Sequence, residues 1–337
     1  MNRIWHDAGR TPAPAPTPAP TPPAGPGSVV PFRGGEPADT IRAFEDDGGA
    51  LDRDGAELFT RFEPDEGLLW CYQKHRGRPC FTVGLLEEIR DLQRDLQRRY
   101  GGGDADRCTA AAEMPLRYLV WASAVPGVFS LGGDLDLFAA LIRGRDREGL
   151  RRYARACVDV CYLNAINLDL PLITVHLVQG DALGGGFESV LSSDVIVAEE
   201  GSQFGLPEVL FGLFPGMGAF SFLSRRLDAA RAERMILSGK VYTAEELAEL
   251  GVVDVLAPRG EGEVAVRAFV AENRRRHALR TALAAVRRRC SPVSYDELID
   301  VVEIWVETAL RLDEADLRRM DRLVAAQVRR QVRARSA

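Results

Sequence analysis

Three consecutive glycines followed closely by a carboxylate form the stretch of this sequence best suited to chemistry. In GDALGGGFE, Gly184, Gly185 and Gly186 come directly after a strand-like run, and Glu188 lies two residues further on. Glycine costs free energy in regular structure, so three together indicate positive φ angles or a close approach to another group. We therefore expect main-chain N–H groups to hold a ligand here, with Glu188 beside it.

Two further stretches rich in glycine or proline lie in the same region. GVFSLGGDLDLF covers residues 127–138, and FGLPEVLFGLFPGMGAF covers residues 204–220 with Glu208 in a proline-led turn. N–H groups at a helix N-terminus and in a second glycine turn can form an oxyanion hole, and two carboxylates can supply an acid and a base. This combination suits proton removal beside a thioester carbonyl, where an enolate must be stabilised.

The glycines do not fit the common nucleotide-binding or hydrolase motifs. GDALGGGFE does not satisfy GxGxxG, and the chain contains neither GxxxxGK[ST] nor GxSxG. A dinucleotide-binding fold, a P-loop and a serine-hydrolase elbow are therefore not expected.

The elements that must position these groups alternate between strands and helices. Residues 68–73 and 79–83 are expected to form a β-hairpin, and residues 85–100 a helix. Alternation of strands with helices over the next 150 residues predicts βαβ units and an α/β fold. The expected strands are 117–124, 171–180, 194–200 and 252–258, and the expected helices are 150–170, 186–194, 219–227, 228–239, 243–251, 262–289 and 295–330.

Composition divides the chain into three regions. Residues 1–67 form an N-terminal extension and lead-in that includes the Pro/Ala/Thr tract 11–27, which cannot build a core and is expected to be extended or disordered. Residues 68–258 form the α/β core, and residues 259–337 form a helical C-terminal region.

Bulk properties exclude several classes of function. The net charge of −6 gives no basic field for nucleic acid or an anionic membrane, and no 18-residue apolar run is present. The six cysteines contain no CxxC pair and the four histidines do not cluster, so no metal site is expected. No signal peptide is apparent at the N-terminus, which favours the cytoplasm.

The motifs ALGGGFE, FGLPE and FSLGGDL resemble the signature stretches of the crotonase (enoyl-CoA hydratase/isomerase) superfamily. The resemblance implies a crotonase fold with a ββα-superhelix core. It also implies that the N–H groups of Leu131 and Gly185 form the oxyanion hole and that Glu188 and Glu208 are the catalytic carboxylates.

Longer stretches, including VFSLGGDLDLFAALIR and EIWVETALRL, are similar to the diffusible signal factor synthases of bacteria. That resemblance implies dehydration of a medium-chain 3-hydroxyacyl chain on acyl carrier protein to a cis-2-enoyl chain, followed by thioester hydrolysis. It implies no metal or redox cofactor, since the acyl group travels on the phosphopantetheine of the carrier protein or on CoA. The implied substrate-binding residues are Gly132, Leu183, Met217, Trp305 and Leu323.

The same resemblance implies partners and leaves alternatives open. Trimers or multiples of trimers are expected, and the C-terminal region is expected to cover the acyl pocket, form the oligomer interface, or both. A CoA-linked hydratase or isomerase is the alternative enzyme. A non-catalytic regulator, with a sensor kinase as partner, is the alternative from another class.

Several of these residues also have plain structural interpretations. Glu188 can complement a helix dipole, and Asp134 is expected to cap a helix. His176 and the helical pair Cys157 and Cys161 are expected in the core. An arginine cluster is expected to be solvated, with docking of an acidic carrier as the alternative; its members are Arg143, Arg145, Arg147, Arg151 and Arg152.

Overall fold

Two β-sheets form the centre of the computed structural model, which describes residues 51–101 and 114–336. The larger sheet has seven strands in the order β1-β2-β3-β4-β6-β8-β11, and the smaller has four in the order β10-β9-β7-β5. The strands of the larger sheet are β1 Arg53–Asp54, β2 Leu58–Glu63, β3 Leu68–Gln73, β4 Tyr118–Ser123, β6 Ile173–Val178, β8 Val195–Glu199 and β11 Val255–Ala257. Those of the smaller sheet are β5 Gly127–Ser130, β7 Gly180–Leu183, β9 Gln203–Gly205 and β10 Val241–Thr243.

A ββα unit recurs along the chain and links the two sheets. The pairs β4–β5, β6–β7 and β8–β9 each place a first strand in the larger sheet and a second in the smaller sheet, and helical structure follows each pair. Strands β5, β7 and β9 are parallel neighbours. Their carboxyl ends therefore meet at one edge of the smaller sheet.

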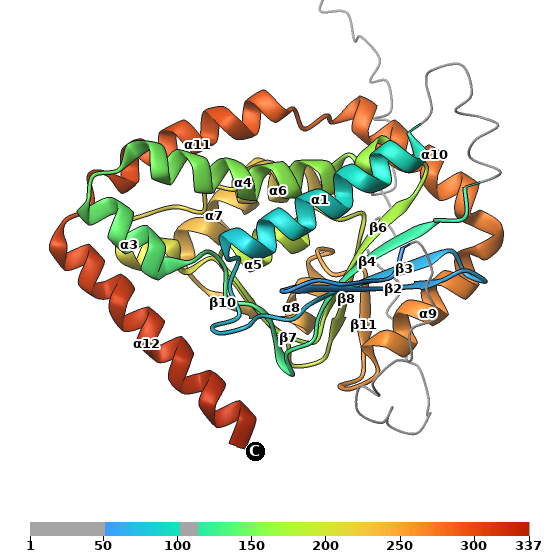
Figure 1. The fold of residues 1–337 in the computed structure, drawn as a ribbon, viewed down its shortest axis with the longest axis horizontal. Coiled ribbons are helices and arrows are strands. Elements are labelled where there is room, and N and C mark those ends of the chain that lie inside the picture. The colour runs from blue at the N-terminus through green and yellow to red at the C-terminus, as the bar shows by residue number, and fades with distance from the viewer. Residues whose placement is uncertain (1–50, 102–113, 337) are drawn as a thin grey trace, which may run out of the picture.

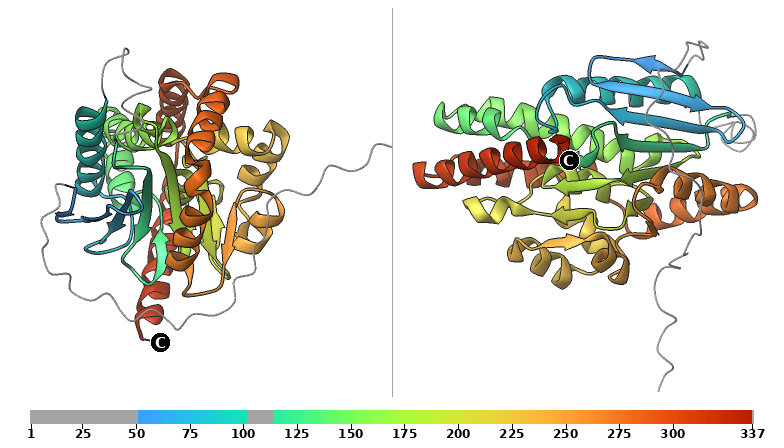
Figure 2. Two further views of the ribbon diagram at one scale, coloured as in Figure 1. Left: turned by 90° about the vertical axis from the view of Figure 1, so that its right-hand side faces the viewer. Right: turned by 90° about the horizontal axis from the view of Figure 1, so that it is seen from below.

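Helices surround the two sheets on several sides. Figure 1 shows α4, α1 and α11 above the sheets, α9 and α10 at one end, and α12 leading away from the body toward the C-terminus; Figure 2 shows the same layers from two other sides. None of the helices in residues 51–101 and 114–336 combines the length and apolarity needed to cross a membrane. The α-helices are α1 Val83–Tyr100, α3 Leu135–Arg143, α4 Arg147–Ala165, α5 Gly185–Leu191, α6 Ala219–Arg226, α7 Ala229–Ser238, α8 Ala244–Glu249, α9 Gly262–Asn273, α10 His277–Cys290, α11 Tyr295–Ala309 and α12 Glu314–Ser336, and the 3-10 helices are η1 Asn167–Asp169, η2 Pro207–Phe211 and η3 Arg274–Arg276.

The larger sheet is buried on both faces. The main hydrophobic core lies between one face and the helices α1, α3 and α4, and it extends to α6, α11 and α12. A second core on the other face packs Trp70, Tyr118 and Val175 against Phe269 and Val270 of α9. Nearly every residue of β3, β4, β6 and β8 is buried, which explains their continuous apolar sequences.

The expected α/β class is confirmed, but the expected hairpin of 68–73 with 79–83 is wrong. The antiparallel partner of β3 is β2, which begins ten residues earlier. The PCFTV segment instead leads into α1, where the Thr82 side chain caps the helix by accepting from the Leu85 N–H at 3.0 Å. Ordered structure therefore begins before residue 68, while the Pro/Ala/Thr tract lies outside the described residues.

Candidate active site

The three sequence motifs meet at the carboxyl ends of β5, β7 and β9. β5 is followed by the turn 131–134, β7 by Gly184 and α5, and β9 by η2, which carries Glu208 in its first turn. Ligand sites in open α/β sheets lie outside the carboxyl ends of the strands, because the turns there bring residues from distant segments together. Topology therefore explains why three motifs separated by dozens of residues form one site.

The N–H groups that face one another across these turns belong to Gly133 and Gly185. A Cβ on Gly185 would lie 3.4 Å from the Gly133 nitrogen, so the two backbone segments nearly touch. Neither N–H has a hydrogen-bond partner within residues 51–101 and 114–336. Both glycines line the same cavity, where their N–H groups can donate to one oxygen.

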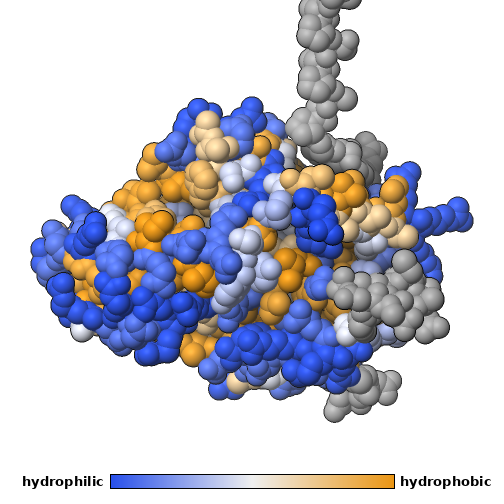
Figure 3. Space-filling model, turned by 90° about the horizontal axis from the view of Figure 1, so that it is seen from above, coloured by the Kyte–Doolittle hydropathy of each residue, from blue (hydrophilic) through white to orange (hydrophobic). Residues whose placement is uncertain are grey.

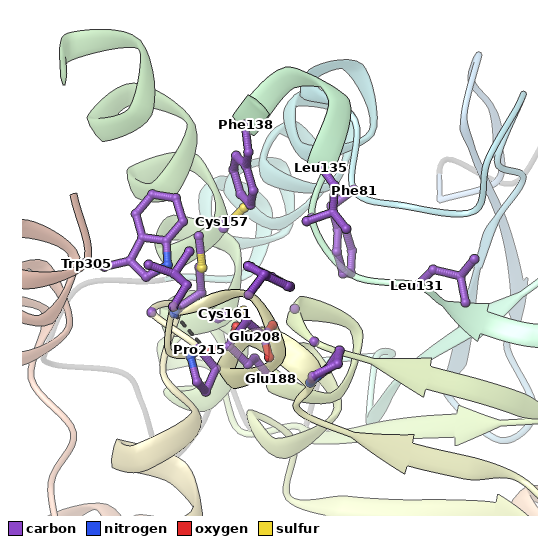
Figure 4. Close-up of a pocket in the computed structure, with 18 of the residues that line it drawn as sticks. Phe81, Leu131, Leu135, Phe138, Cys157, Cys161, Glu188, Glu208, Pro215 and Trp305 are labelled. Atoms are coloured by element: carbon purple, nitrogen blue, oxygen red, sulfur yellow. Dashed lines mark hydrogen bonds between the residues drawn. The ribbon is translucent and has the colours of Figure 1, made fainter. Parts of the chain in front are cut away.

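Leu131, the expected second donor, uses its N–H within the chain. That group donates to the Pro79 carbonyl oxygen at 2.7 Å, and the Leu131 side chain lies apart from the two carboxyl groups in Figure 4. The geometry therefore favours Gly133 in its place. The signal for this residue was the second glycine of LGGD: a Cβ at Gly133 would lie 2.9 Å from the Phe138 ring, so a larger residue there requires the ring to move.

Glu188 is buried, with 1% of its surface exposed, in the first turn of α5. Its Oε1 accepts hydrogen bonds from the N–H groups of Met217 at 2.8 Å and Ala219 at 3.0 Å. Burial raises the pKa of Glu188 above its ordinary value, and the two N–H donors lower it in part. The carboxyl group is thus held by the start of α6, which fixes its orientation toward the cavity.

Glu208 faces the same cavity with fewer partners. The residue is half-buried, yet its Oε2 is out of contact with solvent and has no hydrogen-bond partner among the described residues. Burial raises the pKa of Glu208, and the charge of Glu188 raises it further. Glu188 accepts from two N–H groups of other residues, whereas Glu208 accepts only from its own backbone N–H, so a single proton shared by the pair favours Glu208.

A mostly apolar cavity of about 40 Å³ extends from the two carboxyl groups. Of the expected substrate-binding residues, Met217, Trp305 and Leu323 line it. Gly132 and Leu183 do not line it; they pack against each other, and a Cβ on Gly132 would lie 2.8 Å from the Leu183 carbonyl oxygen. Figure 4 shows the carboxyl groups between Trp305 on one side and the 131–135 segment on the other.

Part of the lining was not singled out in the sequence for this role. Phe138 of α3 and Cys157 and Cys161 of α4 line the cavity beside Trp305, and the Phe138 and Trp305 ring centroids are 5.1 Å apart. Both cysteines are buried on one helix face as expected, and burial raises the pKa of both thiols. They therefore act as small neutral walls of the cavity.

The structural interpretation of two other residues is confirmed. Asp134 is the N-cap of α3 and accepts from the Leu137 N–H at 3.2 Å. His176 is buried and contacts the hydroxyl oxygens of Ser189 and Ser193, and burial lowers its pKa to about 3. Neither residue lines the cavity.

Three members of the arginine cluster form ion pairs with the C-terminal helices. Arg151 contacts Glu303 through two nitrogens at 2.6 and 2.7 Å, Arg147 pairs with Glu307 of α11, and Arg143 pairs with α12. These ion pairs connect α3 and α4 with α11 and α12, the helices that contribute Trp305 and Leu323 to the cavity lining. Figure 3 shows the face over α4 and α11 with hydrophilic side chains spread between apolar patches.

Within the part of the chain that the structure describes, no group of three or more His, Cys, Asp or Glu side chains is arranged to hold a metal ion.

Comparison with known proteins identifies similar chains. The family model described as enoyl-CoA hydratase/isomerase matches residues 110–304, more than half of the chain. A probable enoyl-CoA hydratase of Mycobacterium avium is 33% identical over 163 residues, which cover 47% of this chain and 60% of that protein. The mitochondrial methylglutaconyl-CoA hydratase of Rattus norvegicus is 29% identical over 157 residues, covering 46% of this chain and 48% of that protein. The chain thus spans about half to three fifths of the length of these curated relatives.

Solved structures share the fold over a larger part of the chain. DspI of Pseudomonas aeruginosa superposes with a TM-score of 0.59 and 24% identity, covering 75% of this chain and 96% of that chain. The human mitochondrial delta3-delta2-enoyl-CoA isomerase gives a TM-score of 0.65 at 17% identity, covering 81% of this chain and 99% of that chain. The crotonase fold, with a helical C-terminal region, is therefore confirmed.

Proposed function

Because the chain belongs to the enoyl-CoA hydratase/isomerase family of the crotonase superfamily, we propose that its site interconverts 3-hydroxyacyl and 2-enoyl thioesters. The preferred reaction is dehydration of a medium-chain 3-hydroxyacyl thioester. The observation that carries this proposal is the convergence of Glu188 and Glu208 on one cavity with the N–H groups of Gly133 and Gly185, which have no partner among the described residues.

Each part of the site has a defined role in this reaction. The Gly133 and Gly185 N–H groups donate to the thioester oxygen as negative charge develops on it. One member of the Glu188–Glu208 pair is ionised and takes the α-proton, and the other is protonated and gives its proton to the departing hydroxyl group. The α C–H and β C–O bonds break, the double bond forms, and water leaves.

Hydrolysis to the free acid can use the same groups. A carboxylate removes a proton from water, the water oxygen bonds to the carbonyl carbon, and the C–S bond breaks as the thiol leaves with a proton. We propose that the acyl group arrives on the phosphopantetheine of acyl carrier protein, that the product is the cis-2-enoyl acid, and that the reaction takes place in the cytoplasm. The resemblance to diffusible signal factor synthases supports this finer assignment.

Mass spectrometry of the acyl products tests the proposal. The protein is incubated with 3-hydroxyacyl carrier proteins and the matching 3-hydroxyacyl-CoA thioesters over a range of chain lengths. We expect enoyl thioester and free enoic acid from at least one medium-chain carrier substrate, and neither from a Glu188→Gln/Glu208→Gln double variant. Unchanged substrate across the whole panel would overturn the proposal.

A CoA-linked hydratase or isomerase is the second candidate, and one observation favours it. Arg143, Arg147 and Arg151, three of the five arginines considered for carrier docking, form ion pairs with acidic side chains of the same chain. Higher kcat/KM with CoA thioesters than with carrier thioesters would select this candidate. A non-catalytic regulator with a sensor kinase as its partner is the third candidate. It is the weakest, because a protein without catalytic activity need not retain both carboxyl groups.

We further propose that the chain forms homo-oligomers through α10. Leu279, Leu283 and Val286 lie at helical spacing on this helix and expose 67%, 64% and 54% of their surface. A second copy of the chain would bury this apolar row. Light scattering during size-exclusion chromatography should give a trimer or a multiple of it, and Leu283→Glu should lower the mass of the assembly; an unchanged mass would exclude α10 from the interface.

A further inference from the structure

Tyr153 of α4 connects two segments of the active site without lining the cavity. Its side chain is buried, with 4% of its surface exposed. The hydroxyl group donates to the Phe81 carbonyl oxygen and accepts the Asp134 N–H at 3.0 Å. The same oxygen would lie 3.6 Å from a Cβ on Gly133, next to the oxyanion hole.

The turn 131–134 is attached to the segment 79–81 on both sides of Gly133, and Gly133 itself forms an isolated parallel β-bridge with Phe81. The Leu131 N–H donates to the Pro79 oxygen at 2.7 Å, and the Gly132 oxygen accepts from the Phe81 N–H at 2.8 Å. Asp134 is joined to Phe81 through the Tyr153 hydroxyl group. These bonds fix both sides of Gly133 and leave its N–H facing the cavity.

We propose that Tyr153 is a positioning residue whose hydroxyl group holds the Gly133 N–H in place for the thioester oxygen. This inference rests on the proposed function. Glycine restrains its own backbone weakly, so the neighbouring bonds must set the direction of this N–H. Without the hydroxyl group, the hydrogen bonds from the Asp134 N–H and to the Phe81 oxygen are lost, and only the backbone bridge between Phe81 and Gly133 holds the turn, which can then rotate away from the productive geometry.

Tyr153→Phe removes this hydroxyl group and keeps the aromatic ring. The ring packs edge-on against Phe138 with centroids 5.0 Å apart, a contact that phenylalanine preserves. Tyr118→Phe is the matched control, because Tyr118 is equally buried, lies in the second core, and has a hydroxyl group without a hydrogen-bond partner among the described residues.

Two readouts separate positioning from general stability. Loss of one oxyanion donor costs about 10²–10³ in rate, so a displaced donor should lower kcat for the 3-hydroxyacyl thioester about tenfold or more with KM changed less than about twofold. The second readout is the absorption of bound 2,4-decadienoyl pantetheine. A conjugated thioester absorbs at longer wavelength when its carbonyl oxygen accepts hydrogen bonds, so Tyr153→Phe should reduce the shift seen with the wild type.

The outcomes distinguish this inference from the proposed function. A wild type that neither turns over 3-hydroxyacyl thioesters nor shifts the dienoyl spectrum contradicts the proposed function itself. A wild type that does both, together with a Tyr153→Phe variant that matches it, overturns only the positioning role. A Tyr153→Phe protein that does not fold, or a Tyr118→Phe protein with the same defects, also overturns it, because the hydroxyl group would then act through general stability.

Discussion

Gly184→Ala should separate the position of Glu208 from the stability of the fold. Gly184 precedes α5 with φ of 52°, and an added Cβ would lie 2.5 Å from the Glu208 Oε1. To restore a 3.4 Å contact, the carboxyl group must retreat by about 0.9 Å. A misplacement of about 1 Å can cost about 10²-fold in rate, so we expect kcat to fall by about that factor.

The same substitution has a separate cost in the backbone. A non-glycine residue at this φ is strained by about 1–3 kcal/mol, which lowers the free energy of unfolding. Gly260→Ala is the matched control, because Gly260 has φ of 85° and nothing within 4 Å of the added Cβ. It should lose similar stability and keep its activity.

The assay measures kcat for dehydration and the thermal unfolding midpoint of the wild type and both variants. If Gly184→Ala retains wild-type kcat while its midpoint falls as far as that of Gly260→Ala, Glu208 does not act from the position seen here. If Gly260→Ala loses as much activity as Gly184→Ala, the loss follows stability and the argument from contact distance is refuted.

Three further predictions concern the carboxyl pair, the cavity and the ion pairs. Glu188→Gln should lower the dehydration rate about 10²-fold. Because the charge of Glu188 raises the pKa of Glu208, the substitution should also lower the pKa of Glu208 and move the alkaline limb of the residual pH–rate profile to lower pH. An alkaline limb at the wild-type pH would show that the two carboxyl groups do not interact. Trp305→Leu enlarges the cavity and should shift kcat/KM toward longer acyl chains, because each extra buried methylene contributes about 0.8 kcal/mol. An unchanged chain-length preference would show that Trp305 does not contact the acyl chain. Arg151→Glu and Glu303→Arg should each lower the thermal midpoint, and the double variant should recover it at low salt, whereas additive losses would show that the pair does not couple α4 to α11.

The sequence was sufficient to predict the α/β class, most helices and the two carboxyl groups, Glu188 and Glu208, that line the cavity. Strong apolar runs such as β6 and β8, and helical spacing in α4 and α11, give local signals that tertiary contacts do not overturn. Glu188 and Glu208 stood out because each follows a turn marked by glycine or proline, residues that are uncommon within regular helices and strands.

The smaller sheet and the identity of the second oxyanion donor could not be predicted in this way. Strands β7 and β9 have four and three residues, too few for an alternating pattern to appear. The Leu131 N–H is bonded to the Pro79 carbonyl oxygen, 52 positions earlier, and cannot serve as the oxyanion donor. No local sequence pattern reveals that bond. Phe138 and the two α4 cysteines look like ordinary core residues until the fold places them beside Trp305.

Oxygen exchange at the substrate tests the central claim most directly. A 3-hydroxyacyl carrier protein is incubated with the wild type in H₂¹⁸O, and the recovered acyl species are examined by mass spectrometry. Reversible dehydration over Glu188 and Glu208 predicts ¹⁸O in the 3-hydroxyl group of recovered substrate, accompanied by enoyl product. Label confined to the carboxyl group of released 3-hydroxy acid would identify a simple thioesterase and contradict the account.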